Sequence, residues 1–175
     1  MNGLQNKVAI VTGASSGIGR AVALAFAREG VKVVVGDVAR DGGEETVRLI
    51  KEQGGEAIFV PCDVSQSAQV EALVKRAVET FGRLDFACNN AGIGGEAAQT
   101  ADYSVDGWNK VIGVNLSGVF YGMKYQIPEM LKQGGGVIVN MASILGWVGF
   151  ANSPAYVAAK HGVIGLTKTA AIEYA

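Results

Sequence analysis

Residues 7–30, KVAIVTGASSGIGRAVALAFAREG, decide the fold of this protein. They begin with a short apolar run at 7–11, pass through a turn that contains Gly13, Gly17 and Gly19, and end in a pattern of helical length. Glycines allow a tight turn and let backbone N–H groups approach a phosphate, while the N-terminus of the following helix adds partial positive charge. The stretch therefore predicts a strand, a phosphate-binding turn and a helix, in the order that a dinucleotide site requires.

The same alternation of apolar run and helical pattern continues along the chain. Apolar runs rich in Val and Ile occupy residues 7–11, 31–36, 56–60, 84–88 and 136–142. Candidate helices lie between and after them, at residues 17–29, 41–53, 66–81, 106–132 and from about 154 to the end. Such a succession is typical of a parallel sheet covered on both faces. It predicts an α/β fold, a doubly wound parallel (Rossmann) sheet in a three-layer α/β/α arrangement, with residues 1–175 as a single domain.

Composition narrows the class of protein. Hydrophobic residues make up 49% of the chain and charged residues 18%, which favours a folded chain because burial can offset the entropy lost on ordering. Fifteen basic and 16 acidic residues give a formal charge of -1 with no long basic run, so we expect no nucleic-acid partner. With one histidine and two distant cysteines, Cys62 and Cys88, we expect no metal site and buried reduced thiols.

The chain shows no pattern of a targeting or membrane segment. Its N-terminus lacks a charged stretch followed by an extended apolar region, so we expect no secretory signal and a cytoplasmic location. The stretch between Lys132 and Lys160 carries no charge and is long enough to span a bilayer. Asn140, Ser143 and Pro154 interrupt it, which predicts a buried strand followed by a loop and no membrane partner.

Asp37 ends the second apolar run, at the distance from the glycine turn where a ribose-binding carboxylate is expected. A carboxylate there accepts hydrogen bonds from the adenosine ribose hydroxyls and repels a 2′-phosphate, so NAD is favoured over NADP. No compensating positive charge comes from Ser15, Ser16 or Val38. The nearby Arg40 could supply one, so binding of NADP remains an alternative. A turn-forming role is the structural alternative for Asp37.

Tyr156 and Lys160 are separated by one helical turn, which places phenol and ammonium on one face of the last helix. A nearby ammonium and a positive nicotinamide ring both favour phenolate, so proton transfer by the phenol becomes feasible. Ser143 follows the apolar run 136–142, where strand ends in open α/β sheets deliver ligand-binding groups. A solvated helix face for the Tyr–Lys pair and a capping role for Ser143 are the alternatives.

Taken together, these motifs resemble the main type of the short-chain dehydrogenase/reductase family. TGASSGIG at 12–19 matches the family's TGxxxGxG turn, the pair at 63–64 its adenine-contact dipeptide, and residues 89–92 its NNAG segment. Four polar side chains match the family's catalytic positions in order and spacing: Asn115, Ser143, Tyr156 and Lys160. The resemblance covers the whole chain.

The resemblance implies an oxidoreductase that transfers hydride between a nicotinamide cofactor and a small alcohol or carbonyl substrate. Tyr156 would act as the general acid/base, and Ser143 would polarise the substrate oxygen. Lys160 would hold the nicotinamide ribose and favour the phenolate. Asn115 would anchor a water that links Lys160 to solvent as a proton relay.

The same resemblance implies a cofactor cleft and part of a substrate pocket. The expected cofactor-binding residues are Gly13, Ser15, Ser16, Gly17, Ile18, Gly19, Asp37, Asp63, Val64, Asn90, Ala91, Gly92, Tyr156 and Lys160. Within that set, Asp63 and Val64 would contact adenine, and residues 90–92 would line the adenosine-ribose side. From position along the chain we expect the substrate pocket to be edged by Gly94, Gly95, Glu96, Ile144 and Asn152.

Compared with the family, the chain is expected to lack its C-terminal part. It ends at Ala175, before two further strands, a Pro-Gly segment and a substrate lid, which predicts an unpaired sheet edge and uncovered apolar surface. A homodimer or homotetramer is expected if the full-length fold is present. Three functions stay open: an NAD-linked alcohol or ketone oxidoreductase, an NADPH-linked 3-oxoacyl-type reductase, and an inactive nucleotide-binding fragment.

Overall fold

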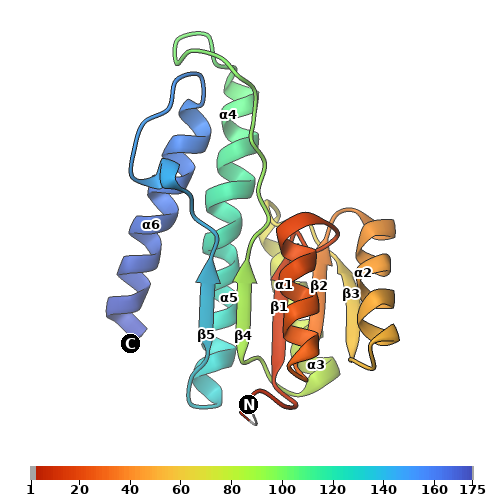
Figure 1. Cartoon of the computed structure of the whole chain (residues 1–175). Helices are drawn as coiled ribbons and strands as arrows, with labels where there is room; N and C mark the ends of the chain where they lie inside the picture. Colours follow the sequence, from red (N-terminus) through yellow and green to blue (C-terminus); the bar gives the residue numbers. More distant parts are fainter. Residues whose placement is uncertain (1–2, 175) are drawn as a thin grey trace.

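Five parallel strands form a single sheet in the computed structural model, which describes residues 3–174 (Figure 1). The strands are β1 (Val8–Thr12), β2 (Lys32–Asp37), β3 (Ala57–Pro61), β4 (Phe86–Asn89) and β5 (Val137–Asn140). Their spatial order is β3-β2-β1-β4-β5, and every neighbouring pair is parallel. The direction of winding therefore reverses between β1 and β4, where a ligand crevice is expected at the carboxyl ends of the strands. The predicted doubly wound sheet is confirmed.

Helices cover both faces of this sheet (Figure 1). The helices are α1 (Gly17–Arg28), α2 (Arg40–Glu52), α3 (Ser67–Phe81), α4 (Val105–Ile112), α5 (Gly118–Lys132) and α6 (Pro154–Tyr174). One apolar core joins α1 and α2 to the sheet, and a second core joins α3 and α5 to it. A third, smaller cluster packs α6 against α5 around Val119, Met123 and Val163.

The central strand shows why continuous apolar runs predict this architecture. Successive side chains of a strand point to opposite faces, so a run that is apolar at every position must be covered twice. In β1, Ile10 belongs to the core under α3 and α5, whereas Val11 belongs to the core under α1 and α2. Both side chains are fully buried.

The predicted continuous helix at 106–132 is wrong in one respect, because a π-helical segment, η1 (Gly113–Ser117), separates α4 from α5. A π turn accommodates an extra residue and is stabilised by contacts outside the helix. Here Asn115 supplies them: its Oδ1 accepts from Ile93 N and its Nδ2 donates to Ile93 O, both at 2.8 Å. The apolar periodicity of the sequence carries no trace of this long-range pairing.

The uncharged stretch before α6 contains β5, a short 3-10 turn named η2 (Ile144–Gly146) and a loop. The predicted order of strand and loop is confirmed, but the prediction that the strand is buried is wrong, because β5 lies at the edge of the sheet. The strand is shorter than the apolar run 136–142, and it pairs only with β4 among the described strands. Val137 and Val139 are each about half exposed on it, in agreement with the expected unpaired edge and uncovered apolar surface. Over residues 3–174, no helix combines the length and apolar character needed to cross a membrane.

Candidate active site

A cavity of about 1210 Å³ opens where the carboxyl ends of the strands meet. Its wall comes from the glycine turn, the ends of β2 and β3, the segments that follow β4 and β5, and the first turns of α6. Every residue that the sequence predicted to contact a cofactor lines this one cavity, and so does Ser143. The topology thus gathers motifs that lie far apart in the sequence.

The glycine turn is shaped to accept an anion. Gly17 has a φ of +52° with no atom within 4 Å of the place where a side chain would begin, so its backbone is open to the cavity. A side chain on Gly19 would instead overlap the carbonyl group of Gly13, which explains why the third residue of α1 is a glycine. The first turn of α1 carries no acidic residue, so its partial positive charge faces the cavity uncompensated.

Asp37 connects this turn to β2 and remains available to a ligand. Its carboxylate is buried, and it accepts hydrogen bonds from Ser15 N and Ala39 N, each at 2.9 Å. A carboxylate oxygen has more than one acceptor site, so Asp37 can still accept ribose hydroxyls from the cavity side. Arg40 does not line the cavity, and its guanidinium pairs with Glu44 at 2.9 Å. Arg40 is therefore not directed at a 2′-phosphate beside Asp37.

The segment after β3 forms the far end of the cavity. Asp63 accepts hydrogen bonds from the backbone N and the hydroxyl of Ser65, at 2.9 and 2.7 Å. Burial, together with the nearby carboxylates of Asp63 and Asp37, raises the pKa of the Cys62 thiol to about 12. Cys62 is therefore a protonated wall residue and not a nucleophile. Cys88 is also buried and free, which confirms the prediction that both thiols are buried, and their reduced state stays a prediction.

The segment after β4 holds the two halves of the sheet together under the cavity. Asn90 Nδ2 donates to Thr12 O at 2.9 Å, and Thr12 Oγ1 accepts from Asn90 N and Ala91 N at 3.0 and 3.2 Å. These bonds join the ends of β1 and β4 at the point where the winding reverses. They fix the width of the crevice that the cofactor is expected to enter.

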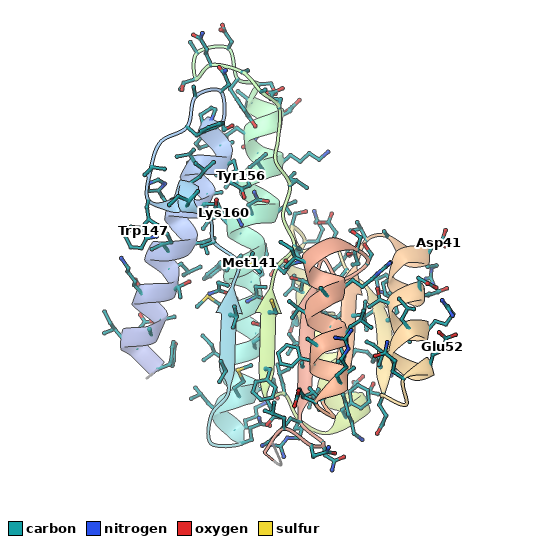
Figure 2. The ribbon with its side chains drawn as sticks, in the orientation of Figure 1. Asp41, Glu52, Met141, Trp147, Tyr156 and Lys160 are labelled. Atoms are coloured by element: carbon teal, nitrogen blue, oxygen red, sulfur yellow. The ribbon has the colours of Figure 1, made fainter. Side chains whose placement is uncertain are left out.

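Tyr156 and Lys160 lie on one side of α6, as their spacing predicts, and both line the cavity (Figure 2). Lys160 Nζ lies 5.5 Å from the centroid of the Tyr156 ring and donates to Met141 O at 2.6 Å. Burial lowers the pKa of Lys160, which is only 4% exposed. Ser143 caps the 3-10 turn η2 and accepts from Leu145 N at 3.2 Å. Its hydroxyl hydrogen is free to point toward a ligand.

Asn115 does not line the cavity, although the resemblance assigned it a catalytic position. Its side chain is fully buried, and both polar ends of its amide bind the backbone of Ile93. Its catalytic role stays a prediction. Its observed contacts support the wall of the cavity, because Ile93 itself lines that cavity.

Three of the residues expected to edge the substrate pocket lie outside the cavity wall: Gly95, Glu96 and Asn152. Glu96 Oε1 instead accepts from Ser104 N at 2.6 Å next to the start of α4, and Asn152 O accepts from Ala98 N at 3.3 Å. Their contact with a substrate stays a prediction. Gly94 and Ile144 do line the cavity.

Sequence reasoning missed nine residues of the cavity wall: Val38, Cys62, Ile93, Lys110, Val114, Met141, Ala142, Leu145 and Phe150. Phe150 had a usable signal, because it is a large apolar residue in a loop between Ser143 and Tyr156. Val114 and Lys110 are one helical turn apart, but only the π-helical segment and the packing of α4 show that both face the cavity.

The comparisons with known proteins agree with this geometry. A family model of short chain dehydrogenases matches residues 7–175. The chain is 50% identical over 174 residues to the cyclohexanol dehydrogenase of Acinetobacter sp. (strain SE19), covering 99% of this chain and 69% of that protein. The protein thus belongs to the short-chain dehydrogenase family.

Two solved structures show the same likeness in three dimensions. The crystal structure of levodione reductase superposes with a TM-score of 0.94 at 42% identity, over 97% of this chain and 67% of that chain. The structure of NAD+-bound xylitol dehydrogenase gives a TM-score of 0.95 at 38% identity, over 99% and 66% of the two chains. The chain spans about two thirds of the length of its relatives, with 66% and 64% coverage of two further curated ones.

Proposed function

We propose that the protein is an NAD-dependent oxidoreductase that interconverts a secondary alcohol and a ketone. One observation carries the proposal: Ser143, Tyr156 and Lys160 line the same cavity as the glycine turn and Asp37. Proton-transferring side chains and a dinucleotide cradle therefore face one space. Membership of the short-chain dehydrogenase family and the NAD+-bound neighbour support this assignment.

The cavity fits a dinucleotide. The open backbone at Gly17 and the N-terminus of α1 offer N–H groups and partial positive charge to a pyrophosphate. Asp37 provides an acceptor for the two ribose hydroxyls and repels an added phosphate, and Arg40 is already paired. When bound, the nicotinamide ring accepts or supplies the hydride.

The chain's own residues handle the proton. The Tyr156 hydroxyl takes a proton from the alcohol during oxidation and returns one to the carbonyl oxygen during reduction. Ser143 donates a hydrogen bond to the same substrate oxygen, which holds that oxygen within reach of the phenol. The Lys160 ammonium, 5.5 Å from the Tyr156 ring centroid, favours the phenolate and binds the ribose. The proton relay assigned to Asn115 stays a prediction.

The substrate side of the cavity suits an uncharged molecule with an apolar body. Ile93, Ile144 and Phe150 line it, and the last two are largely exposed there although they are large and apolar. One relative is named cyclohexanol dehydrogenase, after an alicyclic alcohol, and another is named levodione reductase. We therefore propose an alicyclic alcohol or ketone as the substrate class. A cytoplasmic location and a homo-oligomer stay predictions.

The experiment that tests the proposal replaces Tyr156 by Phe. Oxidation of cyclohexanol with NAD, followed by NADH absorbance, is expected to fall by about 100-fold or more, because only the acid/base hydroxyl is removed. Affinity for NADH, measured by its fluorescence, is expected to be little changed. Tyr174→Phe, at the other end of the same helix, is the control and keeps full activity.

The outcome separates the three open functions. A wild-type protein that binds NADH but turns over no alcohol is the nucleotide-binding fragment, and one that works only with NADPH on 3-oxoacyl thioesters is the reductase. If Tyr156→Phe retains the wild-type rate, the acid/base assignment has to be abandoned.

A further inference from the structure

A chain of side-chain amides runs from the sheet interior to α6, below the cavity. Gln126 and Asn89 exchange two hydrogen bonds, at 2.9 and 3.1 Å, and both side chains are buried. Asn89 Nδ2 also donates to Asn140 Oδ1 at 2.9 Å, and Asn140 Nδ2 donates to Thr167 Oγ1 at 3.0 Å. This amide chain, formed by Gln126, Asn89, Asn140 and Thr167, connects α5, β4, β5 and α6. None of its members lines the cavity.

The bonds fix the direction in which each amide points. Because Gln126 engages both polar atoms of the Asn89 side chain, the Asn89 amide cannot be reversed alone without losing both of these bonds, and the Thr167 hydroxyl, which donates to Val163 O, sets the direction at the other end. Asn89 therefore presents a donor to Asn140, which turns the NH₂ group of Asn140 toward Thr167. The Thr167 hydroxyl completes the chain by donating to Val163 O at 2.7 Å. Every link has a defined donor and acceptor.

The end of β5 consequently holds α6 at two points. Asn140 binds Thr167 through its side chain, and the next residue, Met141, accepts Lys160 Nζ through its carbonyl (Figure 2). Lys160 and Thr167 are two helical turns apart, on the same side of α6. Two attachments spaced along one face set both the axial position and the rotation of a helix.

Apolar packing alone does not define that rotation well. The residues that α6 buries are small apart from Lys160 and Val163: Ala155 and Ala159. Its outer side also carries large apolar residues, and Ile172 is 86% exposed. A helix that is apolar on several sides can be turned with little change in buried area, whereas a hydrogen bond is directional.

We infer that Asn140 and Thr167 are positioning residues for the acid/base pair. Through the two attachments they set the axial position and the rotation of α6. Tyr156 and Lys160 then face the cavity beside Ser143. Neither residue touches the cofactor or the substrate. The inference rests on the proposed function, but its structural part concerns the placement of Lys160 and can be tested by binding alone.

The test removes one hydroxyl. Thr167→Val keeps the shape and loses the acceptor for Asn140, and Thr167→Ser keeps that acceptor. The matched control is Thr169→Val, an exposed threonine two residues further along the same helix. We expect Thr167→Val to weaken NADH binding by about fivefold to tenfold, as the loss of one hydrogen bond allows, while the other two variants bind like the wild type. Fluorescence titration measures the affinity, and circular dichroism confirms that each variant is folded.

A double mutant separates positioning from general loosening of the fold. In a Lys160→Met background, Thr167→Val is expected to have no further effect on NADH affinity, because the group that it places is gone. In the active protein, Thr167→Val also lowers kcat and moves the pH dependence of kcat, and Thr167→Ser restores both.

Four results would overturn the inference: unchanged NADH affinity in Thr167→Val, an equal loss in Thr169→Val, no recovery in Thr167→Ser, or the same loss with and without Lys160. A wild-type protein that binds NADH without turnover would contradict the proposed function. The NADH affinities of the single and double mutants would then still decide this inference.

Discussion

Two buried charged side chains mark the two ends of the candidate site. Asp37 is 8% exposed and Lys160 is 4% exposed, and each is kept in place by backbone groups. A buried charge is costly unless hydrogen bonds compensate it, so its retention in a cavity indicates a ligand-binding role. Asp37 belongs to the expected adenosine end and Lys160 to the expected nicotinamide end.

Substitution of Asp37 tests the cofactor preference at the scale of one residue. Asp37→Ala is expected to weaken NADH binding by about tenfold or more, because it removes the ribose acceptor and the bond to Ser15 N. NADPH binding is not expected to improve, since Arg40 stays paired with Glu44. Fluorescence titration with both cofactors measures this, with Asp41→Ala on the outer surface of α2 as the control. Unchanged NADH affinity would remove the ribose assignment.

At the scale of elements, the start of β4 is fixed by one carboxylate. Asp85 is buried and accepts hydrogen bonds from Val8 N at 3.0 Å and from Arg83, while Lys7 Nζ lies 3.1 Å away. Burial raises the pKa of Asp85, but the bonds from Arg83, Val8 and Lys7 lower it by more, so its pKa lies below the usual value. The ionised side chain therefore joins β4 to the start of β1.

This carboxylate predicts a pH-dependent contribution to stability. Because the pKa of Asp85 is lower in the folded than in the unfolded protein, its contribution is fully present above about pH 4 and is lost as the pH falls through the folded value. Asp85→Asn is expected to lower the free energy of unfolding by about 2 kcal/mol at pH 7, with the deficit shrinking below about pH 4. Urea denaturation across pH measures it.

The matched control for this experiment is Asp102→Asn, an exposed aspartate in the turn before α4. It should leave stability unchanged across the same range of pH. A deficit for Asp85→Asn that stays constant down to pH 2 would show that the ion pairs at the start of β4 are not its cause.

At the scale of the whole molecule, the interior strand β1 and the edge strand β5 differ in how far their side chains are buried. The interior strand β1 is buried at all five positions, whereas β5 exposes every second residue. Val137 and Val139 lie on the exposed face of β5, next to a strand edge that has no partner within residues 3–174. Exposed apolar side chains beside an open edge favour association between molecules.

Charging this face is expected to reduce self-association of the 175-residue protein. Val139→Lys should lower the concentration-dependent light scattering, because it places a charge on the exposed apolar face of an edge strand. Val105→Lys adds the same charge at a still more accessible position at the start of α4, and should have no effect. Equal effects of the two substitutions would assign the change to net charge alone.

The sequence by itself determined the local elements and the list of residues around the expected cofactor. The strands observed lie within two residues of the predicted runs, because continuous apolar runs favour the strands of a parallel sheet. The glycine turn and the Tyr156–Lys160 spacing are local patterns as well. A helix places residues four apart on one face wherever it is packed.

Only the tertiary structure decided how these elements are joined. The π-helical segment at Asn115 exists because its amide meets Ile93, which is 22 positions away. The register of α6 depends on Asn140 and Thr167, which meet across 27 positions. Short-range periodicity decides which residues share a face of a strand or helix. Directional bonds between distant segments decide where that face points, so position along the chain could not show the contacts of Asn115 and Glu96 or the amide chain.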